Sequence, residues 1–320
     1  MKRLISFIVL FILLCFGCGK KTSYVTKTYT VMGTVLNVTL PEKDIFYADS
    51  VFYIFKLIDS LMNPIKEGSD IFKINHSDTF VEVHPFTYEC IEKSLEVARV
   101  TEGAFDITVG VLVHLWHFDE YGKYVFPDED SIEKYRRFVN WREITLRNGK
   151  IKLAKNQQIT VAGIAKGYAI ERAADFLKNK GVSSGIIDAG GDLYLIGKKW
   201  GESWKVGVRD PFTKGINRIL ALSDVSCCTS GDYERYVEQN GKRYSHIFSP
   251  FDGYPVSNGV RSVTVIYKDA TYADAFATAL FVMGPDKAPE LREKVKGLEY
   301  MIITDDTTFY SEGFSKYLVP

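Results

Sequence analysis

Helix-like and strand-like segments follow one another in this chain without regular alternation, and that order restricts its fold more than any other feature. Apolar residues recur at helical spacing in four segments, residues 46–62, 88–101, 163–180 and 269–283. Strand-forming residues dominate 24–40 and 182–267, and two further strands are expected after the last helix. A doubly wound sheet would alternate strands and helices regularly, so we expect an α+β fold in which mixed, largely antiparallel sheets pack against helices.

The chain has 320 residues, and no internal repeat, low-complexity tract or convincing linker divides it. A chain of this length forms one large or two medium domains. Residues 119–150 look like an irregular insertion with a hairpin at Asn148-Gly149. We therefore expect a single domain over residues 25–320, preceded by a polar tether over residues 18–24.

Acidic and basic side chains are balanced, with 40 of each, so the formal net charge is zero. A general nucleic-acid binder usually carries a basic excess, and we therefore expect no nucleic-acid partner. Any anionic ligand must be held by local groups or by a bound metal ion.

The first residues have the pattern of a targeting segment. A positive start, Met1–Arg3, precedes an apolar stretch over residues 4–16 that is too short to span a bilayer comfortably. Gly17 and Cys18 follow, which resembles a bacterial lipoprotein signal over residues 1–17 with lipid attached to Cys18. An ordinary signal peptide or an uncleaved anchor remains the alternative. Either way we expect a cell-envelope protein on the outer side of the cytoplasmic membrane or in the periplasm, and lipid would tether it to a membrane.

Apart from Cys15 within the predicted signal and Cys18, the cysteines of the chain are Cys90, Cys227 and Cys228. Adjacent cysteines rarely pair with each other because the ring is strained, and no zinc-type spacing is present. We expect buried or unpaired thiols, and a disulfide involving Cys90 remains possible.

Small residues surround two oxygen-bearing side chains near the C-terminus, in the segment 273–279. In a helix, Asp274 and Thr278 lie one turn apart on the same face. A carboxylate and a hydroxyl at that spacing offer two hard oxygen ligands to Mg²⁺. A solvated helix face with the same two residues is the alternative.

A second small-residue segment, residues 160–169, is predicted to pass from a strand into a helix. Lys166 falls in the first helical turn, where the helix dipole disfavours a cation, and this suggests an anionic partner. A tightly packed helix start with a solvated lysine is the alternative.

Three further segments carry polar groups that either bind a ligand or only shape the chain. Residues 188–192 place two glycines between carboxylates, which indicates a tight bend after a strand. Residues 229–236 are rich in hydroxyls and charges, and form either a binding loop or an ordinary hairpin. His246 follows that segment, and a lone histidine is more often structural than catalytic.

Taken in order, seven segments of this chain resemble the ApbE family, the FAD:protein FMN transferases. They cover nearly the whole chain after the signal, and no single one is specific. The segments are Met32–Thr34, Ala104–Gly110, Gly163–Ala169, Asp188–Asp192, Thr229–Tyr233, His246–Phe248, and Ala273–Ala275 with Thr278.

The resemblance implies an enzyme that uses Mg²⁺ and transfers the FMN part of FAD to a threonine or serine hydroxyl of a target flavoprotein, with release of AMP. It implies an acceptor that is a flavoprotein subunit of a membrane or exported electron-transfer system. The metal ligands would be Asp274, the Thr278 hydroxyl and the main-chain carbonyl of Gly163. The FAD site would be lined by Met32, Ile65, Ala104, Phe105, Asp106, Thr160, Lys166 and Phe248. His246 is the candidate base for the acceptor hydroxyl, because an unperturbed histidine pKa suits a near-neutral exterior.

Three residues depart from the family pattern. Thr160 and Ser249 stand where aspartate is usual, and Ile65 falls near a position where an aromatic ring commonly stacks on the flavin. Weaker FAD binding would follow from the loss of that stack. Two alternatives therefore stay open, an FAD pyrophosphatase that yields FMN and AMP, and a flavin-binding lipoprotein without catalysis.

Overall fold

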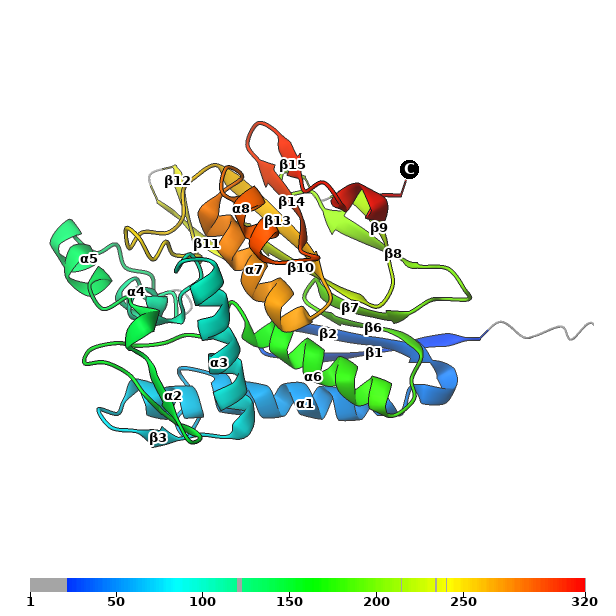
Figure 1. Ribbon diagram of the computed structural model, residues 1–320, viewed down its shortest axis with the longest axis horizontal. Helices are drawn as coiled ribbons and strands as arrows, with labels where there is room; N and C mark the ends of the chain where they lie inside the picture. The colour runs from blue at the N-terminus through cyan, green and yellow to red at the C-terminus, as the bar shows by residue number, and fades with distance from the viewer. Residues whose placement is uncertain (1–21, 120–122, 214, 234, 240, 320) are drawn as a thin grey trace, which may run out of the picture.

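A single antiparallel sheet forms the centre of the fold in the computed structural model (Figure 1). The structure describes residues 22–119, 123–213, 215–233, 235–239 and 241–319. Within these residues the sheet has eight strands, and all neighbouring strands in it run antiparallel. In spatial order the strands are β1 (Tyr24–Val31), β2 (Thr34–Pro41), β6 (Ser184–Ala189), β7 (Asp192–Gly197), β10 (Val225–Gly231), β13 (Val260–Tyr267), β14 (Glu299–Thr304) and β15 (Thr308–Tyr310).

Short strands form three smaller sheets at the periphery. They are the three-stranded sheet β3 (Val81–Glu82), β5 (Lys150–Lys152) and β4 (Thr145–Arg147), and the hairpins β8 (Trp204–Arg209) with β9 (Ile216–Leu222) and β11 (Tyr236–Gln239) with β12 (Lys242–Ser245). The prediction of an α+β fold with largely antiparallel sheets is confirmed.

Helices cover one face of the central sheet, and they make the main hydrophobic core with it (Figure 1). Helix α6 (Ala165–Asn179) packs against both α1 (Tyr47–Met62) and α7 (Ala270–Met283), and α7 lies on β10 and β13. The other helices are α2 (Asp70–Asn75), α3 (Pro85–Val100), α4 (Gly110–Leu115), α5 (Glu129–Arg136) and α8 (Ala288–Lys294), and the 3₁₀ turns are η1 (Glu42–Asp44), η2 (Ile107–Val109), η3 (Trp141–Glu143) and η4 (Phe314–Tyr317).

The β8–β9 hairpin and η4 cover the opposite face of the sheet. Trp204, Leu220 and Phe314 are buried there against Leu195 and Met301 of the sheet, and they form a second core. The central sheet is therefore buried on both faces over its middle strands, and side chains at the strand ends are left to shape a site.

The four long helices predicted from apolar spacing are all present, with small differences at their ends. Helix α7 begins as expected, because the side chain of Asp269 accepts hydrogen bonds from the N–H groups of Thr271 and Tyr272. Helix α3 begins at Pro85, three residues before the predicted start, because His84 caps it and proline suits the first helical position.

Four short helices were not predicted, namely α2, α4, α5 and α8. Helix α5 lies in the region expected to be an irregular insertion, while the hairpin at Asn148-Gly149 in that region is confirmed as β4–β5. Helix α8 follows α7. The strand expected just before α6 is wrong, because Thr160 lies in an extended loop whose N–H bonds to Ile107.

The first strand begins close to the predicted start of the domain. Tyr24, the last residue of the predicted tether, already belongs to β1. The predicted signal peptide over residues 1–17 and the predicted lipidation site Cys18 lie outside the described residues.

Among the described cysteines, Cys90, Cys227 and Cys228 are buried and unpaired. Across the described part of the chain, no helix is both long and apolar enough to cross a bilayer.

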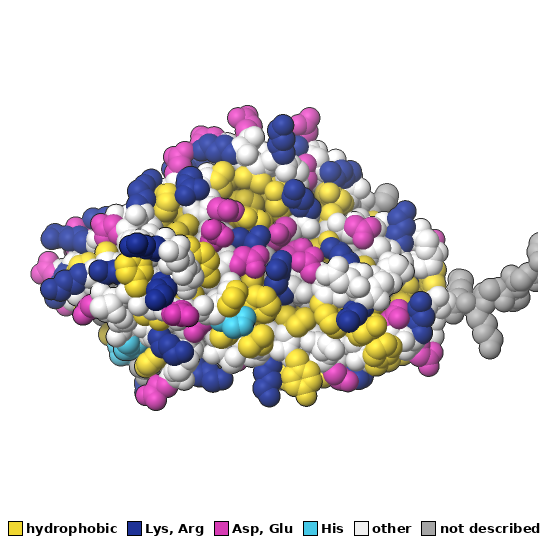
Figure 2. All heavy atoms as spheres, turned by 60° about the horizontal axis from the view of Figure 1, so that its bottom comes forward, with side chains coloured by type: hydrophobic (Ala, Val, Ile, Leu, Met, Phe, Trp, Pro, Cys, Tyr) yellow, Lys and Arg dark blue, Asp and Glu magenta, His cyan; other side chains and the backbone are white. Residues whose placement is uncertain are grey.

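Acidic and basic side chains are interleaved over the face of the molecule in Figure 2, with apolar side chains between them.

Candidate active site

The loop before α6 touches the middle of α7, although the two segments are more than a hundred residues apart in the chain. A Cβ atom built on Gly163 would lie 3.0 Å from Thr278 Oγ1 and 3.3 Å from Phe105 Cε2. A side chain at position 163 would therefore crowd the hydroxyl, and glycine lets the main chain approach it closely. The two segments that the sequence assigns to one metal site thus lie side by side.

Asp274 connects α7 to the start of α6. The residue is buried, and its Oδ2 accepts a hydrogen bond from the N–H of Gly167 over 2.8 Å. Gly167 is the third residue of α6, so its N–H has no partner within its own helix. The carboxylate of one helix therefore caps the other, and this holds Asp274 at the first turn of α6.

The donor atoms at this contact suit a small divalent cation. They are a carboxylate on Asp274, a hydroxyl one turn later on Thr278, and the main chain at Gly163, with the Ser230 hydroxyl 3.4 Å from that of Thr278. Over the described residues, no group of three or more His, Cys, Asp or Glu side chains could enclose a metal ion. Mg²⁺ is commonly held by one or two carboxylates, with phosphates and water completing its shell, so the residues fit Mg²⁺.

A cavity of about 1430 Å³ opens beside this contact. It exceeds the usual volume of a site for a drug-sized ligand, so it has room for a dinucleotide. All twelve residues predicted for catalysis, flavin binding and metal binding line its wall, namely Met32, Ile65, Ala104, Phe105, Asp106, Thr160, Gly163, Lys166, His246, Phe248, Asp274 and Thr278.

Asp106 lines the cavity, but its carboxylate is already engaged within the protein. It accepts hydrogen bonds from the N–H and the hydroxyl of Thr108 and from the N–H of Trp141. Burial raises the pKa of this carboxyl, and the three hydrogen bonds partly oppose that shift. Asp106 thus caps η2 and shapes the cavity wall.

Phe248 also belongs to the wall through its packing. Its ring lies 5.5 Å from that of Phe118 and 6.0 Å from that of Trp116, centroid to centroid. These rings belong to a third hydrophobic cluster built on α4 and α5. The region predicted to be an irregular insertion therefore supports one side of the cavity.

Lys166 has an acidic partner within the protein. Its Nζ lies 2.5 Å from Oδ2 of Asp192, which is almost fully buried and also accepts a hydrogen bond from the N–H of Thr229. The position in the first turn of α6 is confirmed, and the ion pair offsets the unfavourable helix dipole there. Neither a solvated lysine nor an external anion is needed to explain the charge.

The glycine pair beside Asp192 forms the tight bend that the sequence predicts. Gly190 and Gly191 join β6 to β7, with Ala189 paired to Asp192, and both glycines have positive φ. The hydroxyl-rich segment that follows Cys228 is in part a strand, since Thr229, Ser230 and Gly231 end β10. Asp192 and Ser230 thereby reach the site from strand ends.

The imidazole ring of His246 is held by a contact with the main chain of another residue. Its Nδ1 lies 3.0 Å from the carbonyl oxygen of Arg235, and a carbonyl only accepts, so Nδ1 carries the proton. In the neutral ring Nε2 is then free of a proton. Burial, with smaller contributions from the charges of Arg235 and Lys166, lowers the pKa of His246 to about 4, although the hydrogen bond to the carbonyl of Arg235 opposes that shift. The expectation of an unperturbed pKa is wrong, and the ring is neutral at pH 7.

Sequence patterns missed two basic residues of the cavity wall, Lys205 and Arg209 on β8, whereas a third, Arg235, belongs to the charge-rich segment 229–236. The guanidinium of Arg209 lies over the ring of Tyr233, 4.9 Å from its centroid. No motif marks β8, and only the packing of its hairpin on the sheet brings these charges to the cavity.

Comparison with known proteins places this architecture. The model of the ApbE family matches residues 32–302. A protein from Haemophilus influenzae named FAD:protein FMN transferase is 29% identical, covering 99% of this chain and 98% of its own length. One from Vibrio cholerae with the same name is 30% identical, covering 96% of this chain and 94% of its own.

Solved structures show the same fold. The crystal structure of the ApbE protein from Thermotoga maritima has a TM-score of 0.88 and 33% identity, and covers 93% of this chain and all of that one. The flavin transferase ApbE from Vibrio cholerae has a TM-score of 0.83 and 27% identity, with the same coverage. Both solved structures share the α+β fold of this chain. The chain belongs to the ApbE family.

Proposed function

We propose that this chain transfers the FMN part of FAD to a threonine or serine hydroxyl of a target flavoprotein, uses Mg²⁺ and releases AMP. One observation carries the proposal beyond family membership. The main chain at Gly163, the hydroxyl of Thr278 and the carboxylate of Asp274 gather at one wall of a cavity with room for a dinucleotide. FAD is a dinucleotide whose central pyrophosphate needs a counter-charge.

The residues that would hold Mg²⁺ are Asp274, Thr278 and the carbonyl of Gly163. When bound, the ion offsets the negative charge that develops on the phosphate oxygens during transfer. The hydrogen bond from Gly167 keeps the carboxylate of Asp274 in place before any ligand arrives. The Lys166–Asp192 pair and Arg235 add charged groups to the same wall.

The reaction forms a bond between the acceptor hydroxyl oxygen and the phosphorus of the FMN phosphate. The bond from that phosphorus to the bridging oxygen breaks, and AMP leaves with the electron pair. His246 takes the proton of the acceptor hydroxyl at Nε2, while its Nδ1–H stays bonded to the carbonyl of Arg235. Phe105 and Phe248 line the cavity, and their side chains offer apolar contact to the planar flavin ring.

The location of the protein is part of the proposal. Cys18 carries the lipid, and the domain is anchored on the outer side of the cytoplasmic membrane or in the periplasm. The proposal is supported by the lipoprotein-like pattern of residues 1–18. The target is then a flavoprotein subunit of a membrane or exported electron-transfer system. Replacement of Cys18 by alanine should release the protein from the membrane fraction.

The test uses the full-length chain in detergent with FAD, Mg²⁺ and a flavin-free acceptor subunit. Flavin fluorescence that stays on the denatured acceptor means transfer, whereas free FMN with an unlabelled acceptor favours the FAD pyrophosphatase. Asp274→Ala should abolish the reaction. Asp175→Ala is the matched control, because that carboxylate lies on α6 away from the cavity wall and pairs with Arg172. A protein that binds FAD but reacts with neither water nor acceptor would be the non-catalytic lipoprotein.

A further inference from the structure

Helices α6 and α7 cap each other at their first turns. The N–H of Gly167 on α6 donates to Asp274 on α7, and the N–H of Ala270 on α7 donates to Oε2 of Glu171 on α6 over 2.6 Å. Both N–H groups lie in the first turn of their helix, where no partner exists within the helix. We call these two hydrogen bonds the paired caps.

The paired caps are spaced by one helical turn on each side. Glu171 follows Gly167 by four residues, and Asp274 follows Ala270 by four residues. Between the two bonds the helices touch through their main chains. A Cβ atom on Gly167 would collide with the carbonyl oxygen of Ala270 and lie 2.6 Å from Cβ of Asp274. Any slide of α7 along α6 therefore strains both hydrogen bonds at once.

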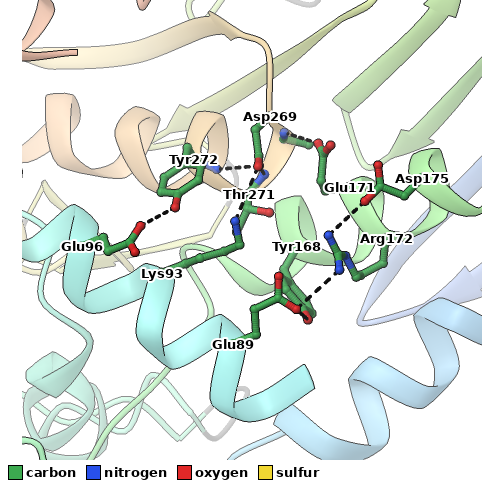
Figure 3. Close-up of polar contacts among 11 residues, drawn as sticks. Glu89, Lys93, Glu96, Tyr168, Glu171, Arg172, Asp175, Asp269, Thr271 and Tyr272 are labelled. Atoms are coloured by element: carbon green, nitrogen blue, oxygen red, sulfur yellow. Dashed lines mark hydrogen bonds and ion pairs between the residues drawn. The ribbon is translucent and has the colours of Figure 1, made fainter. Parts of the chain in front are cut away.

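Figure 3 shows Glu171 reaching from α6 to the start of α7, next to Asp269 and Thr271. Glu171 is buried, at 8% exposure, and it does not line the cavity. The reaction has no use for this carboxyl as an acid, a base or a ligand. Its carboxyl accepts a hydrogen bond from the N–H of Ala270, so the cap on α7 is what the buried carboxyl provides.

Charged groups around Glu171 make this position costly. Asp269 repels it from the cap of α7, and Asp175 does so from α6, while Lys178 attracts it. Lys93 of α3 lies 3.6 Å from Asp269 and balances part of that charge. A buried carboxyl beside a second carboxylate is an unfavourable choice unless its hydrogen bond is needed.

We propose that Glu171 is a positioning residue, which holds the first turn of α7 against α6 and thereby sets the place of Asp274 at the metal site. The inference rests on the proposed function, since it concerns the same cation. Some residues orient a metal ligand without touching the metal themselves. Their replacement commonly changes metal affinity by 10- to 100-fold. Glu171 acts one turn away from the ligand, through the backbone of α7.

The experiment compares two replacements of Glu171 in the full-length protein loaded with FAD. Glu171→Gln keeps an oxygen that accepts from Ala270, while Glu171→Met keeps the length of the side chain and removes the acceptor. Glu89→Met is the matched control. Glu89 lies on α3 and accepts a hydrogen bond of 2.8 Å from the hydroxyl of Tyr168 on α6, the helix that also carries Glu171. It has no part in the paired caps.

Two readouts are taken as Mg²⁺ is varied, the Mg²⁺-dependent rise in melting temperature and the rate of transfer. Binding to the folded state raises the melting temperature, so the first readout needs no turnover. Glu171→Met should need about tenfold more Mg²⁺ in both readouts, with kcat at saturating Mg²⁺ within about twofold of wild type. Glu171→Gln and Glu89→Met should keep the wild-type Mg²⁺ requirement.

Three results would overturn the inference. They are an unchanged Mg²⁺ requirement in Glu171→Met, an equal increase in Glu89→Met, and a failure of Glu171→Gln to rescue. A wild-type protein that responds to Mg²⁺ in neither readout contradicts the proposed function itself, and so separates the two failures.

A second variant removes the donor in place of the acceptor, in case Glu171→Met does not fold. Ala270→Pro lacks the N–H at the first position of α7, where proline suits a helix. Asp269 before it has φ −121° and ψ 123°, the extended conformation that a following proline requires. The same increase in Mg²⁺ requirement is expected, and a wild-type requirement would refute the role of the cap.

Discussion

The carboxylate of Asp274 on α7 accepts a hydrogen bond from the main-chain N–H of Gly167 on α6, 2.8 Å away. The two residues belong to segments that the sequence marks separately, and the contact unites them. It also explains a glycine in the third position of a helix, where alanine would have the higher helix propensity. No side chain fits between α6 and α7 at this point.

Gly167→Ala should therefore lower stability and disturb the metal site together. The added methyl meets the carbonyl of Ala270 and Cβ of Asp274, both on a packed helix that has little room to move. Overpacking of this kind costs roughly 1–3 kcal/mol, which urea denaturation measures. Gly215→Ala is the control, because position 215 is exposed with ordinary φ, and it should change stability by less than about 0.5 kcal/mol. Equal stability of the two variants would contradict the close contact.

Local patterns predicted those parts of the fold that depend on neighbours in the chain. Apolar spacing gave α1 and α7, and the cap Asp269 marked the start of α7. Helix α5 was not predicted because only Ile132 of its eight residues is buried, so its sequence shows almost no apolar stripe. Its cap, Asp128, was the signal available for it.

The candidate site also has one part that local spacing predicts and another part that it does not. Asp274 and Thr278 lie one turn apart on one helix, so their spacing alone proposes a pair of ligands. The ion pair of Lys166 with Asp192 and the cap of Ala270 by Glu171 join residues from different elements. Only the packing of α6 against α7 and the strand ends creates these contacts, and no periodicity in the sequence encodes them.

The pH dependence of transfer should reveal the shifted titration of His246. Burial lowers its pKa to about 4, so the ring is neutral and able to accept a proton over the whole range above about pH 5. The value of kcat/KM should therefore show no fall near pH 6.5 and a fall near pH 4. His246→Ala should lose about 100-fold or more in kcat while FAD still binds. A wild-type limb near pH 6.5 that vanishes in this variant would contradict the shifted pKa.

Ile65→Tyr should tighten FAD binding. Ile65 lines the cavity but is 61% exposed, so a ring there has room to lie along a bound flavin. Aromatic stacking contributes about 1 kcal/mol, which is roughly a fivefold lower dissociation constant. Quenching of flavin fluorescence measures it. Ile216→Tyr, an equally exposed position outside the cavity wall, should leave binding unchanged. An equal gain in both variants would show that the effect is not a stack in the cavity.

Glu171→Gln should change how stability depends on pH. Burial raises the pKa of Glu171 to about 7, and the charge of Asp269 raises it as well, from an ordinary value of 4.5. The folded protein therefore holds a proton there that the unfolded chain releases. The stabilising effect of that proton is complete below pH 4.5 and is lost as the pH rises through 7.

Glutamine carries no charge at any pH, so it avoids this loss. The free energy of unfolding of Glu171→Gln should rise relative to wild type by up to roughly 3 kcal/mol between pH 4.5 and pH 8. Urea denaturation of both proteins at several pH values measures the difference, in which the contributions of most other groups cancel. A difference that stays constant across this range would mean that Glu171 is already ionised in the folded protein at low pH. Its charge would then stabilise the cap on α7, and the burial of the carboxyl would carry no cost.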